Sequence, residues 1–147
     1  MNQNLEELEV LLVEDSPADA ELTLRALRKA NLGDHTLWLQ DGQQALDFLL
    51  GEGQYAGTPP VRPKLILLDM KLPRLSGIDV LRRIKSDARY RGIPVVMLTS
   101  SNEERDIVEA YSLGVNSYLV KPVDFSSLGE QVVKAGAYWI HANRAPQ

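Results

Sequence analysis

Apolar side chains gather in five short runs along this chain, and stretches with a helical period separate the runs. The clearest run lies at 64–69, where four branched apolar residues follow Lys64 and a single carboxylate, Asp69, ends the run. A continuous apolar run of this length is typical of a strand that is buried on both faces. The same kind of run predicts four more strands, at 9–13, 36–39, 93–98 and 115–120.

Between these strands, apolar residues recur at every third or fourth position, which predicts helices. The first helix should begin at Ser16 and Pro17, because serine is a good N-cap and proline suits the first helical turn. The segment 51–63 is rich in glycine and proline and is predicted to be a loop. The predicted helices lie at about 17–31, 42–50, 78–87, 103–113 and 125–141.

Five strands that alternate with five helices indicate an α/β fold. We predict a flavodoxin-like, doubly wound (βα)5 arrangement, with a parallel five-stranded sheet in the order 2-1-3-4-5 and helices on both faces. The length of 147 residues suits one domain, so we expect a single domain over 1–147, with its core at about 9–141 and no output domain. Ligands of open parallel sheets bind at the carboxyl ends of the strands.

Charge and residue usage narrow the possible functions. The net charge is −4 and no run of lysine or arginine could neutralise a track of phosphates, so nucleic-acid binding is not expected. The chain has no cysteine, which excludes disulfides, thiolate metal sites and cysteine nucleophiles. No apolar run approaches the ~18 residues that a membrane span requires, so we expect a cytoplasmic protein that does not associate with membranes.

The residues that follow the predicted strands form a chemically coherent set. They are Glu14 and Asp15 after the first strand, Asp69 after the third, Thr99 after the fourth and Lys121 after the fifth. Three carboxylates at one site repel one another unless a cation lies between them, and oxygen-only ligands suit Mg²⁺ or Mn²⁺ rather than zinc. A hydroxyl and an ammonium beside them could bind a phosphoryl group. The set therefore predicts phosphoryl transfer onto a carboxylate, with Asp69 as the nucleophile.

These residues, in this order and at these intervals, resemble the receiver domain of two-component response regulators, the CheY-like superfamily. The resemblance runs over about 9–141, nearly the whole chain. It implies that Asp69 accepts a phosphoryl group from a histidine kinase, and that the protein catalyses only its own phosphorylation and dephosphorylation. It also implies that Mg²⁺, for which Mn²⁺ can substitute, is bound by Asp15, Asp69 and the backbone carbonyl of Lys71, with Glu14 acting largely through water.

The same resemblance implies roles around the phosphoryl group. Thr99 and Lys121 would bind its oxygens, Ser100 is small enough to leave the site open, and Tyr118 would be the aromatic switch. The peptide bond before Pro122 would be cis. Simpler interpretations remain open: Thr99 could be a helix N-cap, Lys121 a surface lysine and Tyr118 an ordinary half-buried strand residue.

Two other functions use part of this pattern. A haloacid-dehalogenase-type phosphatase also has an aspartate nucleophile at the tip of a parallel strand, but it needs a second aspartate two residues later, where this chain has Lys71. A flavodoxin-like FMN carrier would have a Ser/Thr/Gly phosphate loop after the first strand, where this chain has Glu14 and Asp15. Both are weaker hypotheses than the receiver domain.

A narrower resemblance concerns the kinase. The segment 12–19, the glycine- and proline-rich loop with Tyr55, the segment 93–101 and the late Trp139 are similar to response regulators that are paired with phytochrome-type histidine kinases. This similarity predicts a histidine kinase of that type as the partner.

The last predicted helix suggests a second partner. One apolar stripe should face the core, and further apolar residues lie off that stripe. These further residues favour a homodimer through the fourth helix, the fifth strand and the fifth helix. Alternatively, Tyr138 and Trp139 pack a C-terminal arm on the same domain. The stripe comprises Phe125, Leu128, Val132, Ala135 and Trp139, and the residues off it are Val133, Tyr138 and Ile140.

Overall fold

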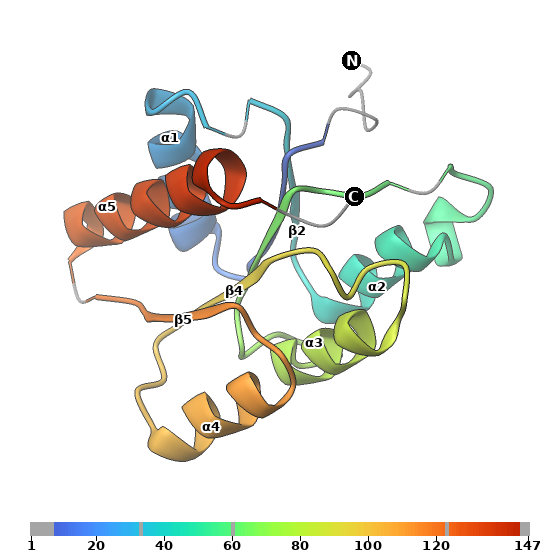
Figure 1. The fold of residues 1–147 in the computed structure, drawn as a ribbon. Helices are drawn as coiled ribbons and strands as arrows, with labels where there is room; N and C mark the ends of the chain where they lie inside the picture. Colours follow the sequence, from blue (N-terminus) through green and yellow to red (C-terminus); the bar gives the residue numbers. More distant parts are fainter. Residues whose placement is uncertain (1–7, 33, 60, 123, 145–147) are drawn as a thin grey trace.

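Five parallel strands form the central sheet of the computed structural model, which describes residues 8–32, 34–59, 61–122 and 124–144. The strand order is β2-β1-β3-β4-β5 (Figure 1). The predicted flavodoxin-like (βα)5 fold is thereby confirmed. The strands are β1 (Val10–Val13), β2 (Thr36–Leu39), β3 (Leu65–Leu68), β4 (Val95–Thr99) and β5 (Ser117–Val120).

Five α-helices connect and follow these strands, close to the predicted ranges. Ser16, Asp41, Ser76 and Asp124 cap α1, α2, α3 and α5, each accepting a hydrogen bond from the backbone N–H three residues later. Such caps satisfy N–H groups that have no partner inside the helix. The helices are α1 (Pro17–Lys29), α2 (Gly42–Leu50), α3 (Gly77–Ser86), α4 (Glu104–Ser112) and α5 (Phe125–Gly136).

Two segments refine the prediction from sequence. The loop predicted at 51–63 contains a short 3-10 helix, η2 (Gly53–Tyr55), and Tyr55 packs edge-on against Phe48 with ring centroids 5.2 Å apart. The last predicted helix changes to a π-helical segment, η3 (Ala137–Ala142), directly after α5. Within the described residues, no helix is both long and apolar enough to cross a bilayer.

Helices cover both faces of the sheet, as Figure 1 shows: α1 and α5 lie on one side, and α2, α3 and α4 on the other. Alternate residues of one strand supply the two cores, because side chains of a strand point to opposite faces. In β3, Leu65 and Leu67 pack toward α1 and α5, whereas Ile66 and Leu68 pack toward α2, α3 and α4. The rigid, apolar sheet therefore fixes the positions of the residues that follow each strand.

The sequence predicted a second apolar side on the last helix, and the packing of the C-terminal segment differs from that prediction. Val133 and Ile140 lie partly buried against the core under α1 and α5, together with Trp139. Tyr138 is 53% exposed and stands edge-on to Trp139, with ring centroids 4.8 Å apart. Burial of apolar area explains this arrangement. The assignment of Val133 and Ile140 to a second apolar side of the helix is therefore wrong. The side chain of Phe125 lies outside the described part of the structure.

Gly77 allows α3 to begin directly against the end of β3. Its N–H donates to the Met70 carbonyl at 2.8 Å, and a Cβ atom at this position would lie 2.0 Å from the backbone oxygen of Asp69. Only glycine fits this close approach of two backbone segments. The turn after Asp69 therefore depends on it.

We expect Gly77→Ala to lower the free energy of unfolding by about 2 kcal/mol, because the backbone must move to admit the methyl group. Urea denaturation measures this loss. Gly129→Ala in α5 is the matched control, since its Cβ would meet only the Ala26 Cβ at an ordinary 3.5 Å; alanine there should be neutral or stabilising by up to about 1 kcal/mol. Equal stability of the two variants would contradict the close approach at Gly77.

Lys85 ties α3 to the loops at the amino edge of the sheet. Its Nζ donates to the carbonyls of Arg91 and Ile93 at 3.0 and 2.9 Å, and to Asn116 Oδ1 at 3.0 Å. Asn116 Oδ1 also accepts from the Val95 N–H at 2.8 Å. Burial lowers the pKa of Lys85 from 10.5 to about 8, because the charged ammonium is poorly solvated there.

A depressed lysine pKa means that the unfolded chain binds the proton more tightly than the folded protein. The stability of the protein relative to Lys85→Met should therefore rise as the pH increases from about 8 to 10.5, by on the order of 1 kcal/mol after allowance for solvent screening. Urea denaturation of both proteins across this range measures the difference. A constant difference would mean that the three acceptors hold the pKa of the ammonium at its ordinary value.

Candidate functional site

The carboxyl edge of the sheet brings the predicted site residues together. In the parallel register Val13 pairs with Leu68, Leu68 with Met97, and Thr99 with Val120. The residues that leave these strands therefore lie at one edge. Glu14 and Asp15 follow β1, Asp69 follows β3, Thr99 ends β4 and Lys121 follows β5.

Three carboxylates crowd at this edge. Glu14, Asp15 and Asp69 each offer an oxygen, and these oxygens all lie within 4.8 Å of one another. Glu14 is 1% exposed and Asp69 8% exposed, whereas Asp15 is open to solvent. Repulsion between buried like charges is strong, so the cluster requires positive charge nearby.

Lys121 supplies the positive charge. Its Nζ donates to Glu14 Oε1 at 2.7 Å, to Asp19 Oδ2 at 2.9 Å and to Asp69 Oδ2 at 3.1 Å. The side chain is only 12% exposed, which argues against an ordinary surface lysine. Burial lowers its pKa, but the hydrogen bonds to Asp19 and Glu14 and the charge of Asp69 outweigh that effect, so the pKa lies above the usual value and the amine stays charged.

Glu14 is the most enclosed of the three acids. Burial raises the pKa of its carboxyl to about 7; the hydrogen bond from Lys121 opposes the rise, and the charge of Asp69 adds to it. Its second oxygen accepts from the Ser16 N–H at 3.2 Å, and its backbone carbonyl accepts from Trp38 Nε1 at 2.8 Å. Glu14 is thus held from both its backbone and its side chain.

Asp69 is oriented from two sides. One carboxylate oxygen accepts from the Lys71 N–H at 3.2 Å, and the other faces Lys121. A cleft opens beside the cluster between the turn after β3 and α4, with Asp15, Lys71 and Asp106 in its lining. A molecule from solvent can therefore approach the acid cluster through this cleft.

Thr99 and Tyr118 are joined through the loop after β4. Thr99 is fully buried, and its Oγ1 accepts from the Ser101 N–H at 3.3 Å. The Tyr118 hydroxyl donates to the Ser101 carbonyl at 3.0 Å, and burial raises its pKa. Ser100, which lies between Thr99 and Ser101 in the chain, is exposed. Thr99 is not a helix N-cap, because α4 begins after Glu103.

The peptide bond between Lys121 and Pro122 differs from the expectation. The structure has no cis peptide bond among the described residues, so the cis form implied by the resemblance is wrong for this structure. The trans form of such a bond is favoured by about 0.5–1 kcal/mol. With the bond trans, Lys121 still reaches Glu14, Asp19 and Asp69, so these contacts do not require the cis form.

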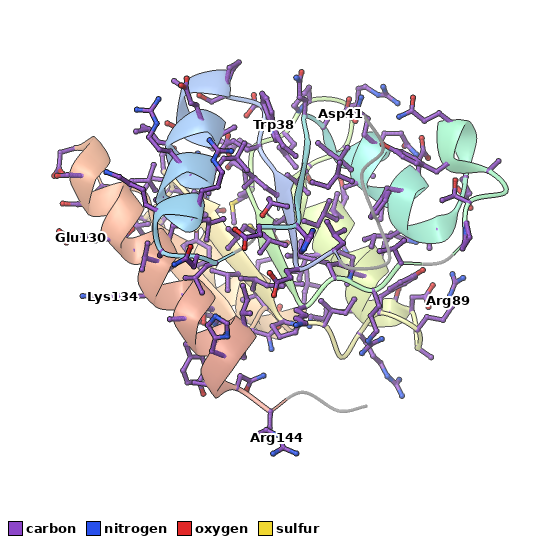
Figure 2. The ribbon with its side chains drawn as sticks, turned by 90° about the horizontal axis from the view of Figure 1, so that it is seen from above. Trp38, Asp41, Arg89, Glu130, Lys134 and Arg144 are labelled. Atoms are coloured by element: carbon purple, nitrogen blue, oxygen red, sulfur yellow. The ribbon has the colours of Figure 1, made fainter. Side chains whose placement is uncertain are left out.

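Two residues of the site were missed from the sequence. Asp19 lies in the first turn of α1 and reaches Lys121; the only signal was an acid soon after the capping serine, which is also common in helices that bind nothing. Trp38 holds the Glu14 carbonyl from the neighbouring strand β2 (labelled in Figure 2), and nothing in the pattern of β2 distinguished it from a half-buried strand residue.

The donor set fits a hard divalent cation. One ammonium contacts the carboxylates of Glu14, Asp19 and Asp69, and Asp15 adds a fourth carboxylate beside Glu14 and Asp69, which leaves the site with an excess of negative charge. Their ligand atoms are all oxygens, as Mg²⁺ and Mn²⁺ prefer. The exposed Asp15 gives such an ion a route from solvent.

Known proteins are similar to this chain in sequence. Curated relatives include the probable methanogenesis regulatory protein FilR2 of Methanothrix harundinacea, 44% identical over 93% of this chain and 86% of its own length. Response regulator Rcp1 of Synechocystis is 39% identical over 93% of this chain and 92% of its length.

Solved structures agree with these relatives. The phosphorylated cyanobacterial phytochrome response regulator RcpA and the Mn²⁺-bound form of Rcp1 each superpose with a TM-score of 0.87, at 37% identity, over 95% of this chain and 99% of theirs. The family model for the response regulator receiver domain matches residues 10–133. Together with the acid cluster and Lys121 at the carboxyl edge of the sheet, this match means that the chain belongs to the response regulator receiver domain family.

Proposed function

We propose that this chain is the phosphoacceptor of a two-component relay and receives its phosphoryl group on Asp69 from a histidine kinase. The observation that carries the proposal is the placement of Asp69, which is nearly buried, crowded by two other acids, in contact with Lys121 and beside an open cleft. A carboxylate that serves only to end a strand needs none of these features. The phosphorylated form would act through a surface that another protein recognises.

In the proposed step an oxygen of Asp69 attacks the phosphorus. The bond from phosphorus to the histidine nitrogen of the kinase breaks, and the electron pair of that bond stays on the nitrogen. Mg²⁺, or Mn²⁺ in its place, would be held by Asp15, Asp69 and the Lys71 carbonyl, with Glu14 acting through water, and would neutralise charge on the transferring group. Lys121 would donate to a phosphoryl oxygen. The protein would catalyse only the gain and loss of its own phosphoryl group.

The surrounding residues would couple this event to the surface. Thr99 would turn its hydroxyl to a phosphoryl oxygen, and the exposed Ser100 would leave room for that oxygen. Because the Ser101 N–H bonds to Thr99 and the Ser101 carbonyl bonds to Tyr118, movement of Thr99 would disturb the hydrogen bond of the tyrosine. Tyr118 would then serve as the switch.

A phytochrome-type kinase is the proposed partner. The similarity to RcpA, a phytochrome response regulator, supports this assignment. FilR2 carries a different regulatory name, so a kinase of another sensory class is the alternative. Phosphotransfer from purified phytochrome kinases, compared with kinases of other sensory classes, would separate the possibilities.

A homodimer through α4, β5 and α5 is proposed as the second interaction. Val108 and Tyr111 on α4 are 56% and 51% exposed, and apolar side chains this exposed are candidates for an interface. In Figure 2, Glu130 and Lys134 project outward from α5, so this outward side of the helix is polar. Light scattering before and after phosphorylation measures the oligomeric state.

Asp69→Asn should abolish labelling by acetyl phosphate and Mg²⁺, because the amide is not a nucleophile. Intact-protein mass spectrometry should show one added phosphoryl group in the natural protein and none in the variant. Asp47→Asn is the control, since Asp47 lies on α2 and bonds to Gln43. Labelling of Asp69→Asn at the natural stoichiometry would refute the assignment, and steady release of phosphate from a phosphomonoester would favour the phosphatase hypothesis.

Lys121→Met should destabilise the metal-free protein at about pH 8 by about 3 kcal/mol, because it leaves buried carboxylates without a counter-charge. This pH lies above the pKa of about 7 that Glu14 has beside Lys121, so its carboxylate is mostly charged in the natural protein. Saturating Mg²⁺ should restore part of the loss, since it binds only the folded form. Urea denaturation measures both effects, and Lys134→Met on the exposed side of α5 is the control. A loss that Mg²⁺ leaves unchanged would count against a cation among these carboxylates.

A further inference from the structure

The ammonium of Lys121 has three N–H donors, and the structure gives each of them a carboxylate. The three acceptors are Glu14, Asp19 and Asp69, at 2.7, 2.9 and 3.1 Å. Each of the three distances suits a charge-assisted hydrogen bond. The position of Nζ is therefore set by three attachments that come from three different parts of the fold.

Asp19 differs from the other two acceptors. Glu14 and Asp69 belong to the group of acids whose oxygens converge within 4.8 Å, whereas Asp19 does not belong to that group. Asp19 lies one turn further, on α1, where the Ser16 hydroxyl accepts from its backbone N–H at 3.3 Å. Its side chain is 24% exposed. The cap of α1 thus holds the backbone of Asp19 in place, and its carboxylate contacts the ammonium from outside the acid group.

A divalent cation among Glu14, Asp15 and Asp69 changes the forces on Lys121. The cation competes for the same carboxylate oxygens and repels the ammonium. Of the three present acceptors, Asp19 alone keeps its full negative charge for Lys121. Without Asp19, the long and flexible lysine side chain would turn toward solvent, where its ammonium is hydrated.

We propose that Asp19 is a positioning residue that holds the Lys121 ammonium beside Asp69 while the cation and the phosphoryl group occupy the acid group. This inference rests on the proposed function of Asp69. Asp19 does not touch the reacting atoms; it acts through Lys121. Its removal therefore slows phosphoryl transfer only as long as position 121 carries the ammonium.

The test compares the rate constant for labelling by acetyl phosphate at saturating Mg²⁺. Asp19→Asn should lower the rate constant by about tenfold, the equivalent of one charge-assisted hydrogen bond, and Asp19→Glu should recover part of it. Glu21→Gln is the matched control, because it removes the same charge from α1 at a side chain that pairs with Arg25 instead. In the Lys121→Met background, Asp19→Asn should have no further effect.

A second readout does not use the reaction. The unfolding free energies of the natural protein, Asp19→Asn, Lys121→Met and the double variant form a double-mutant cycle. The coupling between the two residues should persist when Mg²⁺ is added. A coupling that disappears with Mg²⁺ would overturn the inference.

The outcomes separate this inference from the proposed function. If Asp19→Asn labels as fast as Glu21→Gln while Asp69→Asn does not label, the role of Asp19 is wrong and the phosphoacceptor stands. Asp19→Asn could also slow labelling by the same factor in the Lys121→Met background as in the natural protein. That result would overturn a role exerted through Lys121. If the natural protein takes no label at all, the phosphoacceptor assignment fails, and the role of Asp19 fails with it.

Discussion

The site depends on one electrostatic balance, in which a single ammonium faces more carboxylates than it can neutralise. Lys121 donates to Glu14, Asp19 and Asp69 at once, and the exposed Asp15 adds another negative charge nearby. Because charges interact strongly where solvent is scarce, this excess of negative charge dominates the electrostatic energy at the carboxyl edge of the sheet. A cation or a new hydrogen bond there changes the energy of every group in the cluster.

The two edges of the sheet use lysine in different ways. At the amino edge, Lys85 donates to two backbone carbonyls and to the Asn116 side chain, all of which are neutral groups. At the carboxyl edge, Lys121 donates to three carboxylates, and the proposed function would have Glu14 and Asp69 bind a metal and Asp69 accept a phosphoryl group. Lys85 therefore holds loops of the fold together at one edge. Lys121 lies at the other edge, where a bound ligand would change its contacts.

The elements around the site differ in how firmly they are held. The turn after β3 is constrained by Gly77, whose backbone lies against that of Asp69. In contrast, α4 buries only Ala110 and begins without a side-chain cap. Segments with few buried contacts open and shift at lower free energy than a core strand. A weakly held helix therefore lies beside the loop whose Ser101 contacts both Thr99 and Tyr118.

The sequence by itself determined the strands, the helices, their order in the sheet and the five residues at the strand tips. Strict alternation of buried runs and periodic stretches allows few topologies, and parallel strands deliver the residues that follow them to one edge. Only the tertiary structure decided that Asp19 and Trp38 belong to the site, that Val133 and Ile140 turn inward with Trp139, and that the Lys121–Pro122 bond is trans. These features arise from contacts between side chains far apart in the chain, or from small differences in energy, and neither leaves a periodic signal in the order of residues.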